Sequence, residues 1–115
     1  MNKSSFLMIN VSNDTWFGNS IGPYQHLNIA RIRSIENNRW SIRATNDGVS
    51  AIIANNGTIV DKIEKGDIGI LEGKVQLISK NTFYSSYGYL FSYIFSLIMV
   101  LLTIFIGIWK KTSSK

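Results

Sequence analysis

The pattern of apolar and polar positions divides the chain into a mixed region and a long apolar run near its C-terminus. Phe6–Val11 is apolar at every position but one, which is typical of a strand that is buried on both faces and has a neighbour on each side. A polar loop over residues 12–22 follows, and Pro23 suits the first turn of a helix that ends at Asn37 or Asn38. The side chains expected on the buried face of this helix are those of Leu27, Ala30, Ser34 and Ile35.

Further short strands are predicted after this helix. They cover Trp40–Thr45, Val49–Ala54, Thr58–Ile63 and Ile68–Leu77. Asn46-Asp47-Gly48 and Asn55-Asn56-Gly57 separate the first three, because Asn-Gly sequences supply the positive φ that tight hairpins need. A region of about 80 residues with one full helix buries little core. The pattern therefore indicates part of an α/β sheet rather than a complete one.

The apolar run Gly88–Trp109 predicts one membrane-spanning helix. Thirteen of its 22 residues are Leu, Ile, Phe or Val, and no charged residue occurs between Lys80 and Lys110. As a helix the run is about 33 Å long, which is enough to cross a hydrocarbon core of about 30 Å. A buried core helix of this length would keep one polar face, so a membrane span is the favoured interpretation.

The charges next to this run predict its orientation. Lysines follow the span at once, and the positive-inside tendency places them in the cytoplasm. Met1–Asn10 lacks the long apolar stretch of a signal peptide, so export of the region before the span would need a segment upstream of Met1. The expected organisation is a folded region over residues 1–80, an interfacial linker over 81–87, the span over 88–109 and a basic tail over 110–115.

Composition narrows the candidate chemistry. The 115 residues include no cysteine, which excludes disulfides, cysteine-based metal sites and a thiol nucleophile within them. The net charge is +5, but residues 1–80 are nearly balanced, with nine Lys or Arg and seven Asp or Glu. A basic tail beside an apolar run is not the pattern of a nucleic-acid-binding protein. No metal or cofactor site is predicted, because the single histidine has no carboxylates at ligand spacing.

The loop and the start of the helix hold two candidate sites. Ser20, His26 and Asp14 could form a serine triad, but no nucleophile elbow or oxyanion loop accompanies them. A hydrogen bond between His26 and the preceding loop is therefore favoured. Trp16 and Phe17 lie in a polar loop at the end of a strand, where they either fold back onto the core or line an apolar pocket.

Four arginines form the third candidate. Arg31, Arg33, Arg39 and Arg43 could make a phosphate-binding face. Arginines at such spacing more often pair with acids such as Glu36 and hold loops in place, and that interpretation is favoured.

Several of these residues belong to a longer motif. Ser12-Asn13-Asp14-Thr15-Trp16-Phe17-Gly18, followed by Gly22-Pro23-Tyr24-Gln25-His26, resembles the late part of the nitrilase-like domain of the apolipoprotein N-acyltransferase family, within the carbon–nitrogen hydrolase superfamily. The match continues at the family's spacing through Ala30, Arg31, Arg33, Glu36, Arg39, Arg43, Ala44, Asn46 and Gly48. Thr82-Phe83-Tyr84 with Gly88 is similar to the family's Thr-Pro-Tyr-x-x-x-Gly motif, with Phe83 in place of proline.

The resemblance implies a fold, a location and a set of site residues. The fold would be a partial nitrilase-like αββα sandwich followed by one C-terminal transmembrane helix. Family members are inner-membrane enzymes of Gram-negative bacteria, so the folded region is expected on the periplasmic side and the C-terminus in the cytoplasm. Asn13, Trp16 and Phe17 are implied to lie on a loop near the substrate pocket. The implied structural motif comprises Gly18, Gly22, His26, Arg31, Arg33, Glu36, Arg39, Arg43, Asn46 and Gly48.

The resemblance also implies an activity whose catalytic residues have no counterpart here. Family enzymes transfer a fatty acyl chain from a membrane phospholipid to the N-terminal cysteine of a diacylated lipoprotein, through a thioester on a cysteine that a glutamate activates beside a lysine. In the family these three residues precede the motif at Ser12–Gly18, and no catalytic residue is predicted in this chain. The expectation is a C-terminal fragment that is inactive alone.

Two alternatives remain open. The chain could be one subunit of a split acyltransferase, whose missing N-terminal half is a separate chain that supplies the cysteine, glutamate and lysine. It could also be a membrane-anchored binding module without enzymatic activity.

Overall fold

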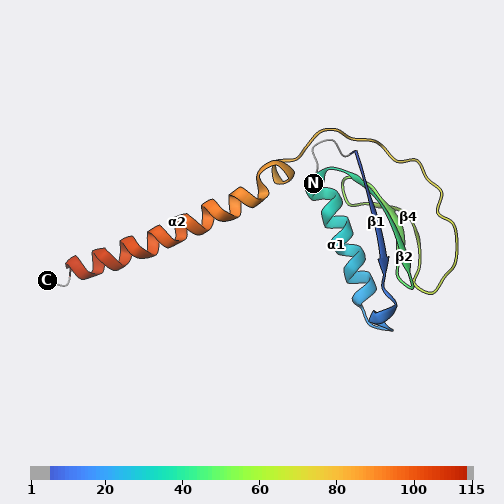
Figure 1. The fold of residues 1–115 in the computed structure, drawn as a ribbon, viewed down its shortest axis with the longest axis horizontal. Coiled ribbons are helices and arrows are strands. Elements are labelled where there is room, and N and C mark those ends of the chain that lie inside the picture. Colours follow the sequence, from blue (N-terminus) through green and yellow to red (C-terminus); the bar gives the residue numbers. More distant parts are fainter. Residues whose placement is uncertain (1–5, 114–115) are drawn as a thin grey trace. The chain divides into compact units, whose positions relative to one another are not determined.

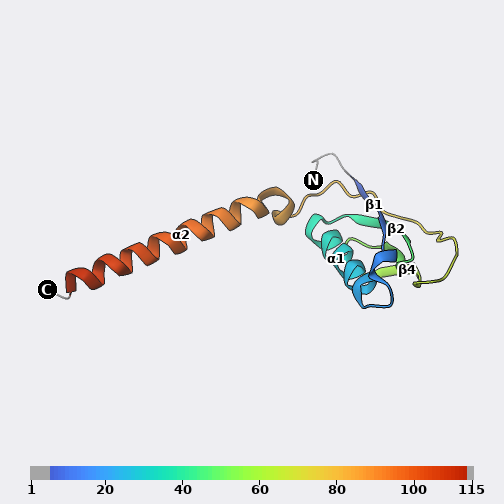
Figure 2. The same cartoon turned by 60° about the horizontal axis from the view of Figure 1, so that its bottom comes forward.

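The computed structural model describes residues 6–113, which divide into two compact units. The first unit, up to Ser85, contains a four-stranded sheet and one long helix, and the second is the remainder of a long C-terminal helix (Figures 1 and 2). The elements in chain order are β1 (Leu7–Asn13), a short 3-10 helix η1 (Thr15–Phe17), α1 (Gly22–Asn37), β2 (Trp40–Asn46), β3 (Ser50–Ile53), β4 (Ile59–Ile63) and α2 (Phe83–Ser113). The predicted α/β class is confirmed.

The sheet combines one parallel pair of strands with two antiparallel pairs. Its strand order is β1-β2-β3-β4, which is also the order along the chain. β1 and β2 are parallel and are joined by α1, whereas β2–β3 and β3–β4 are antiparallel hairpins. The first four predicted strands and the predicted helix are confirmed within one or two residues at most ends.

The core of the first unit is small and lies between α1 and the sheet. α1 runs along one face of the sheet (Figure 1), where Leu27 packs with Val49, Ala51 and Ile53. At about 0.8 kcal/mol for each buried methylene group, so few apolar side chains supply a modest hydrophobic stabilisation. Hydrogen bonds and buried ion pairs therefore carry much of the order in this unit.

The structure confirms two predictions for α1 and contradicts a third. The helix ends where it was predicted to, because Asn38 adopts a left-handed conformation with φ of 51°. Ser34 is buried as predicted and donates a hydrogen bond to Ser41 Oγ at 2.9 Å. The prediction for Ile35 is wrong: its side chain is half-exposed, because it lies over the turn at Gly57 instead of facing the sheet.

The two hairpin turns use different residues for their positive φ. In the second turn Gly57 has a φ of 81°, as predicted. In the first turn the positive φ falls on Asp47, at 54°, and not on Gly48. Glycine is required at position 48 because the turn lies close to the Asp14 side chain: a Cβ atom on Gly48 would lie 2.5 Å from Asp14 Oδ2.

The last predicted strand, Ile68–Leu77, is wrong. Residues 64–82 form an irregular segment in which the structure assigns no strand. The alternation of apolar residues is present, but a strand exists only where its backbone pairs with another strand. The segment instead touches the sheet at intervals, with Gly69 near Ile63 and Gly73 near Ile52.

The end of this segment is fixed to the C-terminal end of α1. Arg39 donates to Lys80 O at 2.7 Å and to Asn81 Oδ1 at 2.8 Å. Thr82 Oγ1 donates to Glu36 O. Residues that are more than 40 positions apart in the sequence are therefore held together just before α2 begins.

The second unit consists of helix α2 after Ser85. Thr82 caps the start of α2, since its Oγ1 accepts from Ser85 N at 2.9 Å and Ser85 Oγ hydrogen-bonds back to Thr82. The helix has 31 residues and contains the predicted span 88–109. It is long and apolar enough to cross a membrane, and its apolar side chains are exposed. It is therefore a candidate membrane span.

Candidate functional site

A buried carboxylate at the end of β1 organises the candidate site. Asp14 is fully buried, and its backbone N–H donates to Asn46 O at 3.0 Å. Its Oδ1 accepts from Ser12 Oγ at 2.6 Å and lies 3.0 Å from His26 Nδ1. Its Oδ2 accepts from Arg43 Nη2 at 2.9 Å. One side chain thus joins β1, α1 and β2.

The ionised form of Asp14 is favoured in this environment. Burial alone would raise its pKa, but the hydrogen bonds from Ser12 and His26 and the positive charge of Arg43 outweigh burial. Together they hold the pKa of the Asp14 carboxyl below its ordinary value of 3.8. At neutral pH the cluster therefore contains a buried ion pair between Asp14 and Arg43.

Arg43 is the second centre of this cluster. Its side chain is 1% exposed, and its Nη1 donates to Asn10 Oδ1 at 2.5 Å. Its Nε is buried and has no hydrogen-bond partner. Asn10 and Arg43 are directly opposed in the β1–β2 register, so strand pairing places them side by side.

The sequence pattern did not predict Asn10 as a site residue, and it did not predict the contact between Asp14 and Arg43, although both residues belong to the family motif. The one local signal was an acidic residue directly after an apolar strand. The group on the neighbouring strand that such a residue contacts cannot be identified until the register of the two strands is known.

The serine triad does not form. His26 does contact Asp14, which confirms the predicted hydrogen bond between His26 and the loop that precedes α1. The hydroxyl of Ser20 instead accepts a hydrogen bond from Gly22 N at 3.2 Å. The arrangement is an Asp–His pair that holds the loop and not a nucleophile with its base.

The two aromatic residues of the loop face different surroundings. Trp16 is 80% exposed, stacks on Phe17 with ring centres 4.5 Å apart, and donates from Nε1 to Asn13 O at 3.1 Å. Phe17 is half-buried and lies edge-on to His26 at 6.1 Å. Gly22 makes room for it, because a Cβ atom there would lie 2.3 Å from the Phe17 ring. The assignment of these two aromatics to a substrate pocket stays a prediction.

Polar groups fix the backbone of the loop around these aromatics. Asn13 Oδ1 accepts from Thr15 N and Thr15 Oγ1, at 3.2 and 2.7 Å, and lies 3.4 Å from Asn46 Nδ2. Gly18 ends η1 with a φ of 55°, a backbone conformation that glycine adopts readily. Asn13 and Asn46 therefore lie side by side at the end of β1 and β2, and Gly18 ends the short helix that follows.

The four arginines hold separate parts of the fold and do not form a phosphate-binding face. Arg31 donates from Nε to Gly57 O at 2.8 Å, and Arg33 pairs with Glu36 at 3.1 Å. Arg39 holds the segment before α2, and Arg43 holds Asp14. The prediction that they pair with acids is confirmed for Arg33 and Arg43. Arg31 and Arg39 also hold loops in place, but they do so through carbonyl and amide oxygens.

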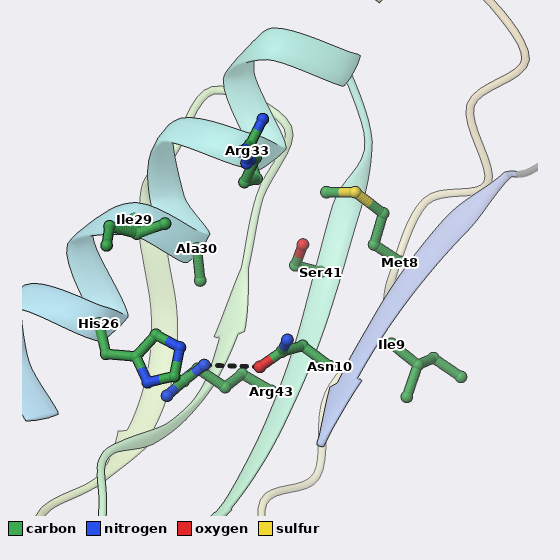
Figure 3. A pocket seen from close by; sticks show the side chains of 9 residues that line it. All are labelled: Met8, Ile9, Asn10, His26, Ile29, Ala30, Arg33, Ser41 and Arg43. Carbon is green, nitrogen blue, oxygen red and sulfur yellow. Dashed lines mark hydrogen bonds between the residues drawn. The ribbon is translucent and has the colours of Figure 1, made fainter. Parts of the chain in front are cut away.

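A cavity lies beside this cluster, between α1 and the first two strands. Its volume is about 410 Å³, and Figure 3 shows Met8, Asn10 and Arg43 approaching it from the strands while Ile29 and Ala30 line it from α1. His26, Arg33, Ser41 and Ile9 complete the lining. The lining is mostly apolar, its only charged side chains are arginines, and it contains no carboxylate. Over residues 6–113 no group of three or more potential metal ligands comes together.

Comparison with known proteins identifies the family. Residues 1–79 match the family model described as carbon–nitrogen hydrolase. Three proteins named apolipoprotein N-acyltransferase are similar: that of Pseudomonas paraeruginosa is 49% identical over 83 residues, and those of Shewanella oneidensis and Rickettsia typhi are each 40% identical over 88 residues. The aligned regions cover 72% to 76% of this chain but only 16% to 18% of these relatives.

The partial α/β sheet, the helix along one of its faces and the candidate membrane span agree with a partial nitrilase-like fold. Together with the match over residues 1–79, these observations show that the chain belongs to the carbon–nitrogen hydrolase family.

Proposed function

We propose that this chain takes part in the N-acylation of bacterial lipoproteins. In that reaction a fatty acyl chain passes from a phospholipid to the amino group of a lipoprotein's N-terminal cysteine. The observation that carries the proposal is 40% to 49% identity, over about three quarters of the chain, to proteins named apolipoprotein N-acyltransferase. The buried Asp14 cluster supports it, since it fixes the loop that carries the resemblance to that family.

We place the nucleophile of this reaction outside the 115 residues. Acyl transfer through a thioester needs a cysteine thiolate, and this sequence contains no cysteine. The contribution of the chain is then to shape the site and not to carry the acyl group. Asn13, Trp16 and Phe17 are proposed to lie along the path of the acyl chain, with Trp16 offering an exposed aromatic surface.

The proposed location follows from α2. Its apolar stretch crosses the inner membrane, and Lys110 and Lys111 in its last turn lie on the cytoplasmic side, as the positive-inside tendency favours. The sheet and α1 then lie in the periplasm, where a lipoprotein and the outer leaflet of the inner membrane are both accessible.

Reconstitution tests this function. The Pseudomonas paraeruginosa relative is truncated before the segment that matches this chain and placed in proteoliposomes with and without the full chain. Transfer of a labelled acyl group from phospholipid to a diacylated lipopeptide is measured. Restored transfer only when both are present supports the proposal. Turnover by this chain alone refutes the proposal that the nucleophile lies outside the 115 residues. If the two proteins assemble but no acyl group is transferred, a binding module without enzymatic activity is favoured.

A further inference from the structure

The cavity between α1 and the first two strands has a polar end and an apolar part. Figure 3 shows the polar side chains of His26, Arg43 and Asn10 gathered at one end, and the apolar side chains of Ile29, Ala30 and Met8 lining the space beyond them. Its volume of about 410 Å³ lies within the range of about 300–1,000 Å³ that is usual for small-molecule sites. A mostly apolar space on which a few polar groups converge is typical of such a site.

One side of this cavity is accessible. Within residues 6–113, β1 pairs only with β2 and forms the border of the sheet (Figures 1 and 2). Ile29, which lines the cavity from α1, is 54% exposed. A small molecule can therefore enter past Ile29 without a change in the backbone.

The polar end of the cavity offers more hydrogen-bond donors than acceptors. Arg43 is 1% exposed, and its Nε–H has no acceptor within the described residues. Asn10 Oδ1 already accepts from Arg43 Nη1, which leaves the two N–H groups on Asn10 Nδ2. Ser41 Oγ accepts from Ser34 Oγ, which leaves its own O–H. A buried donor without an acceptor is unfavourable, so a ligand that fits this end brings acceptors.

The charges near the cavity decide which acceptor fits. Arg43 pairs with Asp14 at 2.9 Å, and Arg33 pairs with Glu36 at 3.1 Å. An anion is therefore attracted by the unused N–H and O–H groups and not by a net positive charge. Hydrogen bonds to an ionised acceptor are about twice as strong as those between neutral groups. A carboxylate, with two acceptor oxygens, suits these donors best.

The apolar part of the cavity sets the length of the ligand. His26 lies at the polar end, and Arg33, seven residues further along α1, lines the other end (Figure 3). At about 1.5 Å per residue this path is about 10 Å long, which suits a chain of about eight to ten carbon atoms. Met8, Ile29 and Ala30 are the apolar side chains along it.

We propose that this cavity binds a medium-chain carboxylate, whose head group accepts hydrogen bonds from Arg43 Nε and Asn10 Nδ2 and whose chain lies between Met8 and Ile29. The proposal goes beyond acyl transfer and does not depend on it, because every residue that forms the cavity belongs to this chain. Its test therefore needs this chain alone.

Photolabelling of the full chain in lipid nanodiscs tests the proposal. The probe is decanoate with a diazirine in its chain, and digestion followed by mass spectrometry locates the label. We expect saturable labelling of the peptides that contain Met8 or Ile29, and unlabelled decanoate is expected to prevent it. No saturable labelling of these peptides means that the cavity has another occupant, such as a polypeptide, and overturns the proposal.

Two competitors with the same chain test the head group. Decan-1-ol has a neutral head group, and decylammonium has a head group that only donates. Each is expected to compete at least about tenfold less well than decanoate, because neither brings an ionised acceptor. Equal competition by all three molecules overturns the proposal.

A matched pair of variants tests the position of the chain. Ile29 and Ile32 are equally exposed on α1, at 54% and 53%, but only Ile29 lines the cavity. I29W fills the space without adding a charge and is expected to weaken decanoate binding by about tenfold or more, whereas I32W is expected to change it by less than about twofold. Equal effects of the two substitutions contradict the proposal.

Asn10→Asp tests the contact with the carboxylate. The substitution keeps an acceptor for Arg43 Nη1 but replaces the Nδ2 donors by a second carboxylate oxygen. N10D is expected to weaken decanoate binding by at least about tenfold and to change decan-1-ol binding by less than about twofold, because only the carboxylate meets a like charge. Unchanged binding of decanoate to N10D overturns the proposal. Hydrogen exchange at β2 and β3 reports whether each variant is folded.

Discussion

Replacing Asp14 by asparagine tests whether the buried cluster holds the first unit together. The substitution keeps the size of the side chain and removes its charge, so no cavity is created. It leaves Arg43 buried at 1% exposure without its carboxylate partner and weakens the contacts to Ser12 and His26. Breaking a buried ion pair from one side costs about 3–5 kcal/mol. This is a large share of the stability of a domain of this size.

The matched control is Glu36→Gln. Glu36 pairs with Arg33, whose side chain is 61% exposed, at a distance of 3.1 Å that is close to the 2.9 Å between Arg43 and Asp14. A solvent-exposed pair is worth only about 0–1 kcal/mol. The two substitutions therefore remove the same kind of charge at a similar distance. They differ in burial and in the further contacts of Asp14 to Ser12 and His26.

Urea denaturation of the full chain in detergent micelles, followed by tryptophan fluorescence and by hydrogen exchange at β2 and β3, measures the difference. We expect D14N to lower the free energy of unfolding by about 3–5 kcal/mol and E36Q by less than about 1 kcal/mol. An effect of D14N as small as that of E36Q would refute the view that this ion pair organises the unit.

The lowered pKa of Asp14 also predicts how the free energy of unfolding of D14N and of the wild type depends on pH. Because the folded-state pKa of Asp14 is lowered, its charge stabilises the wild type above the ordinary pKa of 3.8. That stabilisation is lost as the pH falls from 3.8 towards the lower pKa of the folded state. D14N is expected to lack this part of the acid dependence. Denaturation curves of both proteins between neutral pH and pH 3 check the sign.

Three further substitutions probe other contacts. G48A is expected to lower the free energy of unfolding by about 1–3 kcal/mol, since its Cβ would lie 2.5 Å from Asp14 Oδ2, and denaturation measures it. R39A is expected to release residues 79–81, which limited proteolysis detects as new cleavage before α2, whereas unchanged cleavage would contradict the contacts seen at Lys80. T82A is expected to cost about 1 kcal/mol by removing the cap of α2, and faster exchange confined to the first turn of that helix would show it.

Local signals in the sequence predicted local structure well. Pro23 and Asn38 mark the two ends of α1, and Gly57 supplies the positive φ of the second hairpin turn. These residues act through their own backbone preferences, so their effects do not depend on the rest of the fold. The apolar run of α2 is equally independent, since length and composition alone suffice to predict a span.

Features that depend on distant pairing could not be predicted in the same way. The contact between Arg43 and Asp14 joins residues 29 positions apart and requires the parallel register of β1 and β2. The alternating apolar residues of Ile68–Leu77 suggested a strand, but no neighbour pairs with them. Trp16 and Phe17 stood out as large aromatics in a polar loop at the end of a strand, whereas Asn13 came only from the family motif.

The open edge of β1 has a consequence for the amount of this protein that a cell can hold. Copies that α2 holds in one membrane, as proposed, would meet far more often than they would in solution. Each copy presents one open strand edge of seven residues, because β1 is paired with β2 on its other side. We therefore expect open edges of different copies to pair with one another as the concentration of the chain rises, so that association at β1 limits how much of the chain stays free of aggregates.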